Sequence, residues 1–168
     1  MSDSPRAEQI SLAPGPLRSV AVAALAVSAA ALVAMAAVEA WQVFARYVLN
    51  SPPAWTEPLA LLLLKIALML AAAVAVRSET HFRFALGAEA LGARARAAFE
   101  ALARLATAAI GLVFAVSSVR LMIATWSMKT PGVSLSEGLY YAPFVGGGVL
   151  FVLFALEQLT RGAAEPER

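Results

Sequence analysis

Four long apolar stretches, separated by shorter polar connections, dominate the pattern of the chain. They run over residues 20–38, 59–76, 105–126 and 139–160, and the first carries no charged residue. At about 1.5 Å of rise per residue, a helix over the first stretch is roughly 28 Å long, close to the thickness of a bilayer's hydrocarbon core. The pattern therefore predicts an all-α integral membrane protein with four transmembrane helices.

These stretches divide the chain into three parts. We expect a disordered lead at 1–18, a four-helix membrane domain at 19–160 and a polar tail at 161–168. The first helix should begin near Ser19 and end at Tyr47 or Val48, because the two prolines of "NSPP" cannot continue it. A cleaved signal peptide is the alternative for the first stretch, although its apolar run is longer than a usual signal core.

Residues 81–104, between the second and third stretches, follow a different pattern. Apolar residues recur there at approximate helical spacing, with Arg94, Arg96 and Glu100 between them. One interpretation is an amphipathic helix on the membrane surface, whose basic residues lie near anionic lipid headgroups. The other is an extension of the third transmembrane helix.

Basic residues predict how the chain is oriented. Nine lie in the two terminal segments and the middle connection, whereas the other two connections hold only Arg46 and Lys129. Because cytoplasmic loops carry an excess of Lys and Arg, both termini and the middle connection are predicted to be cytoplasmic. The segment "FARYVLNSPPAWTEP" then faces outward, with Trp41, Tyr47 and Trp55 at the level of the lipid headgroups.

Composition excludes several classes of function. The chain has 61% hydrophobic residues and no cysteine, which removes disulfides, thiol catalysis and thiolate metal sites. Its pI is 9.4, but a net charge of +2 and the lack of a polar face argue against nucleic acid as a partner. No glycine-rich phosphate loop is present. His81 is the only histidine, so one chain cannot hold a bis-histidine haem. We expect no metal, no cofactor and no enzymatic activity.

Charged residues within the apolar stretches are the main candidates for function, since charges are costly inside a bilayer. Glu39 and Arg120 should lie at similar depth in the outer half, and we predict that they form an ion pair; outward extension of Arg120 is the alternative. Lys65 lies roughly 13 Å below Thr56 along its helix and has no obvious partner in the chain. It either extends outward to the headgroups or faces another protein.

A glycine triplet, Gly146, Gly147 and Gly148, lies inside the fourth stretch. Small residues in transmembrane helices usually permit close helix packing, and ligand contact is the alternative.

Several motifs resemble the small membrane subunit of tripartite ATP-independent periplasmic (TRAP) transporters. Arg46, Tyr47, Trp55, Thr56 and Glu57 match the family's outer-loop motif, in which Pro58 replaces a second glutamate and Leu61 a basic residue. The segment "VRSETHFRF" resembles the family's sequence after the second span, with Arg77, His81 and Arg83 in place and Ala85 where an acidic residue is usual. "YYAPFVGGG" is similar to the opening of its last span. The resemblance extends over about residues 19–160.

This resemblance implies a subunit of a secondary transporter in the bacterial inner membrane. In the family, a periplasmic binding protein delivers an organic acid to a membrane pair, and the large multi-span permease subunit carries the substrate and sodium sites. The small subunit is implied to be a scaffold, and Arg46, Trp55 and Glu57 either contact the binding protein or form a structural loop without a partner. Two other functions stay open from the residues alone: a stand-alone homo-oligomeric carrier or channel, and a membrane anchor of a respiratory complex.

Overall fold

The computed structural model describes residues 15–77 and 93–162, and its elements are helical. They are α1 (Arg18–Tyr47), α2 (Thr56–Arg77), α4 (Ala93–Ala124), the short 3₁₀ helix η1 (Glu137–Tyr141) and α5 (Ala142–Gly162). Four helical segments in these ranges are long and apolar enough to cross a membrane. The predicted fold class is therefore confirmed.

The observed boundaries agree with the turn signals of the sequence. Helix α1 begins at Arg18 and ends at Tyr47, a few residues before the two prolines. Helix α4 is continuous from Ala93, so residues 93–104 are the first turns of the third spanning helix, as the extension interpretation predicts. The rest of the predicted amphipathic segment, including His81 and Arg83, lies outside the described residues.

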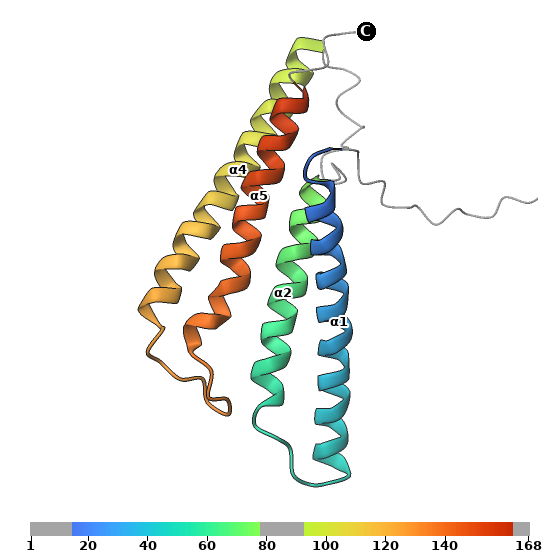
Figure 1. The fold of residues 1–168 in the computed structure, drawn as a ribbon, viewed down its shortest axis with the longest axis vertical. Helices are drawn as coiled ribbons and strands as arrows, with labels where there is room; N and C mark the ends of the chain where they lie inside the picture. The colour runs from blue at the N-terminus through green and yellow to red at the C-terminus, as the bar shows by residue number, and fades with distance from the viewer. Residues whose placement is uncertain (1–14, 78–92, 163–168) are drawn as a thin grey trace, which may run out of the picture.

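The four long helices stand side by side in one layer, in the order α1, α2, α5, α4 (Figure 1). Helices α1 and α2 form one antiparallel hairpin, α4 and α5 form the other, and the two hairpins meet where α2 packs against α5. Both inter-helix connections within the hairpins lie at one end of the layer, which we call the hairpin end. The start of α1 and the end of α5 lie toward the opposite end, which we call the termini end.

Small side chains line the contacts between neighbouring helices. Ala21, Ala24 and Ala73 belong to a buried hydrophobic cluster, together with Phe154, which is fully buried. In α1, Ser28 donates a hydrogen bond of 2.8 Å from its hydroxyl to the backbone carbonyl of Ala67 in α2. Small residues and interhelical hydrogen bonds drive helix association in lipid, where apolar surface alone supplies little force.

Two adjacent glycines let α5 approach both of its neighbours. A Cβ at Gly147 would lie 2.8 Å from the Cβ of Met69 in α2, and one at Gly148 would lie 2.7 Å from the carbonyl oxygen of Gly111 in α4. Gly146 has nothing within 4 Å of its hypothetical Cβ. The structure thus places Gly147 and Gly148 at helix contacts on two sides of α5, and Gly146 away from any contact.

Candidate functional site

The four outer-loop residues singled out in the sequence lie together at the hairpin end. Arg46 and Tyr47 close α1, while Trp55 and Glu57 flank the start of α2. All four are exposed, and Tyr47 retains 75% of its accessible surface. Their side chains are therefore available to a membrane headgroup or to another protein.

Neighbouring residues give this connection its shape. Asn50 has a φ of 50°, in the left-handed region that Asn tolerates better than most residues. The N–H of Ser51 donates to the carbonyl of Ala45 at 3.1 Å. The buried hydroxyl of Thr56 donates to the carbonyl of Pro53 at 2.8 Å. Backbone groups and the hydroxyl of Thr56 thus hold the turn. The exposed side chains of the motif form none of these hydrogen bonds.

The second connection, between α4 and η1, packs directly against the first. Gly132 has a φ of +83°, and a Cβ there would overlap the backbone carbonyl of Ala54. Ser136 accepts a hydrogen bond from the N–H of Gly138 at 3.2 Å and donates one to the carbonyl of Trp126 at 2.6 Å. The glycine is needed because only a residue without a side chain permits this backbone-to-backbone approach in a left-handed conformation.

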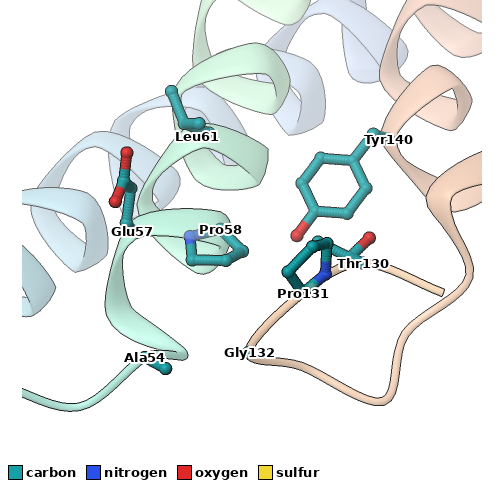
Figure 2. Close-up of a pocket in the computed structure, with 8 residues that line it drawn as sticks. All are labelled: Ala54, Glu57, Pro58, Leu61, Thr130, Pro131, Gly132 and Tyr140. Carbon is teal, nitrogen blue, oxygen red and sulfur yellow. The ribbon is translucent and has the colours of Figure 1, made fainter.

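A pocket of about 440 Å³ lies between the two connections (Figure 2). Its lining residues are Ala54, Glu57, Pro58, Leu61, Thr130, Pro131, Gly132 and Tyr140. Figure 2 shows the ring of Tyr140 extending toward the gap between Pro58 and Pro131, with its hydroxyl at the leading end. The hydroxyls of Tyr140 and Thr130 are buried and have no hydrogen-bond partner within the described residues.

Lys65 lies against Tyr140, one of the residues that line this pocket. Its Nζ lies 5.0 Å from the centroid of the Tyr140 ring and 6.0 Å from that of Phe144. A cation over an aromatic face is attracted by the ring's electrons. Because Tyr140 precedes the first residue of α5, this position indicates that the ammonium extends from mid-helix toward the hairpin end. The sequence pattern did not identify these aromatic partners.

The predicted ion pair between Glu39 and Arg120 is wrong. Both side chains are exposed. They belong to α1 and α4, which lie at opposite edges of the layer with α2 and α5 between them (Figure 1). Similar depth in the membrane was the basis of the prediction, but depth does not determine which helices are neighbours.

A buried ion pair that the sequence pattern did not predict lies toward the termini end. Nε of Arg77 donates to Oε2 of Glu157 at 3.0 Å, and its Nη2 donates to Oε1 at 3.4 Å. The two side chains are 1% and 5% exposed. This pair joins α2 to α5. The sequence did contain a signal for this pair, since Arg77 directly follows the second apolar stretch and Glu157, of opposite charge, lies near the end of the fourth.

Backbone groups at two helix ends complete this polar cluster. The amide of Gln158 donates to the carbonyls of Val76 and Arg77 at 2.6 and 3.3 Å, and Oε1 of Glu157 accepts from the N–H of Leu17 at 3.4 Å. The last carbonyls and the first N–H groups of a helix have no partner within that helix. Side chains of α5 thus supply hydrogen-bond partners for backbone groups at the end of α2 and at the start of α1. We refer to Leu17, Val76, Arg77, Glu157 and Gln158 as the terminal cluster.

Within 15–77 and 93–162, no group of three His, Asp or Glu side chains lies close enough to hold a metal ion. The arrangement offers instead an exposed motif, a largely apolar pocket with two buried hydroxyls, and a buried cluster that joins the helices.

Comparison with known proteins identifies the family. Residues 35–165 match the family described as "Tripartite ATP-independent periplasmic transporters, DctQ component". A similar curated protein is the sialic acid TRAP transporter small permease protein SiaQ of Vibrio cholerae serotype O1, which is 28% identical over 130 residues, covering 76% of this chain and 74% of that relative. The family match includes all of α2, α4 and α5 and the last turns of α1. The chain therefore belongs to the DctQ component family of TRAP transporters.

Proposed function

We propose that this small permease subunit is a scaffold for a large multi-span permease subunit in the bacterial inner membrane. The large subunit would carry the substrate and sodium sites and import an organic acid delivered by a periplasmic binding protein. The name of the Vibrio relative supports an acidic sugar as the first substrate to test. Both termini of this chain would face the cytoplasm, as its basic residues predict.

The single-layer arrangement is the observation that carries this proposal. Secondary transporters usually build their sites at mid-membrane from discontinuous helices. Here the described spanning helices are continuous, and one layer leaves both of its faces uncovered by the described residues (Figure 1). Large apolar side chains such as Val33, Ile123 and Val113 are more than 60% exposed. An extended apolar layer suits the flank of a larger membrane protein.

The positions of the intramembrane charges speak against a stand-alone carrier built from one chain. Glu39 and Arg120 lie at opposite edges of the layer, and Lys65 lies against Tyr140 between α2 and α5. Three charges that lie apart in this way do not line a common pathway within the monomer.

The exposed motif at the hairpin end is proposed to contact the binding protein. Arg46, Tyr47, Trp55 and Glu57 combine both charges with two aromatic rings on one end of the layer. Aromatic and Arg residues are enriched among the residues that dominate protein interfaces. A basic and an acidic residue at the rim would also orient an approaching partner.

Reconstitution tests the scaffold directly. Liposomes should contain this chain alone, the large subunit alone, or both, and each set should be assayed with the binding protein, the radiolabelled acid and either sodium or potassium outside. Uptake is expected only with both subunits, the binding protein and sodium. Uptake by liposomes containing this chain alone would contradict the scaffold function, and equal uptake by the large subunit alone would show that no scaffold is needed.

A further inference from the structure

Helix α4 carries an arginine on the side that faces away from the rest of the layer. A Cβ at Gly111 would lie 3.0 Å from the carbonyl oxygen of Gly148 in α5, and Ser118 is 5% exposed, so Gly111 and Ser118 mark the side that packs on α5. At about 100° per residue, Arg120 lies about 180° around the helix from Gly111. Its side chain is exposed and forms no ion pair or hydrogen bond with the residues that the structure describes. Arg120 is therefore a charge on the outer edge of the layer.

Contacts between the helices show how deep Arg120 lies. The glycine pair of α5 contacts α2 at Met69 and α4 at residues 111–115. Arg120 lies about seven residues nearer the hairpin end than that α4 contact, which makes it level with Leu63 of α2. This level is about 10 Å deeper than Thr56, where α2 begins. The arginine thus starts from the hydrocarbon layer, where a charge is costly and usually paired.

The direction of the side chain disfavours a lipid phosphate as its partner. Side chains of a helix lean toward the N-terminus of that helix. Helix α4 begins at the termini end and runs to the hairpin end (Figure 1), so the side chain of Arg120 leans away from the outer headgroups. A guanidinium that extends to those headgroups has to run against this lean and cover about 10 Å. A counter-charge at the arginine's own depth is the better match.

An open groove on α4 lies beside Arg120. It has a volume of about 360 Å³, and its lining residues all belong to α4: Ala109, Ile110, Val113, Phe114 and Ser117. Val113 is 64% exposed and lies seven residues before Arg120, which places it two turns deeper on nearly the same side of the helix. Small residues such as Ala109 and Ser117 permit close approach of another helix in lipid. Groove and charge together form one surface for a helix.

A second copy of this chain does not supply the counter-charge. Edge to edge in the same orientation, it would bring its Glu39, exposed on α1, toward α4. The hydrogen bond between Ser28 and Ala67 makes Glu39 level with Thr56, because each residue lies eleven positions from that bond. Glu39 would thus lie about 10 Å outside the level of Arg120. Two α4 edges in contact would bring two arginines together, which is costly.

We propose that the outer edge of α4 binds a spanning helix of the large permease subunit that carries an aspartate or glutamate at the level of Arg120. The guanidinium donates two parallel hydrogen bonds to this carboxylate. The partner helix packs along the groove, and its apolar side chains cover Val113. This inference rests on the scaffold function proposed above and adds the edge of contact and the chemistry of the partner.

The first test measures the affinity of the two full-length subunits. The small subunit, fluorescently labelled, is titrated with labelled large subunit in mild detergent, and energy transfer gives the Kd. Arg120→Gln is expected to raise the Kd roughly thirtyfold, because it leaves a desolvated carboxylate unpaired, whereas Arg120→Lys keeps the charge and should raise it less. Lys129→Gln is the matched control, because it removes an exposed positive charge after α4, and its Kd should not change. Equal Kd values for Arg120→Gln and the unmodified protein overturn the proposal.

Crosslinking then locates the partner while Arg120 is kept. A photoreactive p-benzoylphenylalanine at Val113 should join the small subunit to one spanning segment of the large subunit, and mass spectrometry should find an Asp or Glu in that segment. Exchanging the two charges, with Arg120→Glu in this chain and the identified acid replaced by arginine, should restore affinity that either single change removes. Crosslinks only to lipid, to a second copy or to a segment without an acidic residue overturn the proposal.

The liposome assay separates this inference from the scaffold function. If uptake needs both subunits while Arg120→Gln leaves their Kd unchanged, the scaffold function stands and the docking edge is wrong. If the large subunit takes up the acid alone and does not bind this chain, the scaffold function is wrong and the docking edge fails with it.

Discussion

Replacing Glu157 with glutamine should destabilise the helix layer more than any change on its surface. The carboxylate accepts two hydrogen bonds from Arg77, at 3.0 and 3.4 Å, and one from the N–H of Leu17 at 3.4 Å. Glutamine retains the shape of the side chain but removes the negative charge of Glu157 from beside the guanidinium, on a side chain that is 1% exposed. Breaking a buried pair by removing one partner costs about 3–5 kcal/mol, because an uncompensated charge remains. The lower value corresponds to roughly a hundredfold change in the unfolding equilibrium.

Removing both charges together should cost less than removing one. Replacement of buried ion pairs by well-packed apolar residues is often neutral or stabilising. We therefore expect the double variant Arg77→Met, Glu157→Met to be more stable than either single variant. A double variant that is more stable than each single variant would show that the two side chains interact, whatever the absolute free energies of unfolding.

Equilibrium unfolding in mixed micelles of mild detergent and dodecyl sulfate, followed by circular dichroism, measures these stabilities. Glu39→Gln is the matched control, because Glu39 is exposed on α1, and it should stay within about 0.5 kcal/mol of the unmodified protein. If Arg77→Met and Glu157→Met destabilise additively in the double variant, the two residues do not interact and the argument from burial is refuted.

Three further predictions concern orientation, helix packing and partner contact. A cysteine placed at Ser51 should react with a membrane-impermeant reagent from outside and one at Ser78 only after permeabilisation; the reverse labelling would invert the orientation. Gly148→Ala should destabilise by about 1–3 kcal/mol, since its Cβ would meet the α4 backbone, while Gly146→Ala in open space should be neutral or slightly stabilising; equal unfolding midpoints would contradict this. Trp55→Ala should weaken the affinity of the assembled complex for the binding protein, measured by surface plasmon resonance, without preventing assembly. Unchanged affinity would show that the motif is a structural loop without partner contact.

Hydropathy and turn chemistry predict the helices but not their order in the layer. The apolar stretches and the two prolines located α1 to within one residue and α2 to within three, because membrane thickness and proline geometry are local constraints. Nothing in the hydropathy pattern places α2 and α5 in the middle and α1 and α4 at the edges. Glu39 was therefore assigned to Arg120 from depth alone.

Because the sequence pattern does not show which helices are neighbours, it also did not predict two contacts at the candidate site. Arg77 was identified as part of a loop motif, but its partner Glu157 is 80 residues away and becomes a neighbour only through the contact of α2 with α5. Lys65 meets Tyr140 through that same contact. The exposed motif at the hairpin end was recognisable because its residues are adjacent in sequence, whereas the pocket depends on Gly132 approaching Ala54 across two connections.

The two hairpins contact each other at both ends of the layer, and these contacts should resist some motions of the layer more than others. Gly132 meets Ala54 at the hairpin end and Arg77 meets Glu157 toward the termini end, so sliding of one hairpin along the other would have to break contacts at both places. Bending about the line between α2 and α5 meets no such obstacle, because no second layer formed by residues 15–77 and 93–162 backs the first (Figure 1). We expect the small subunit to resist shear along its helices while taking its curvature from the protein it supports.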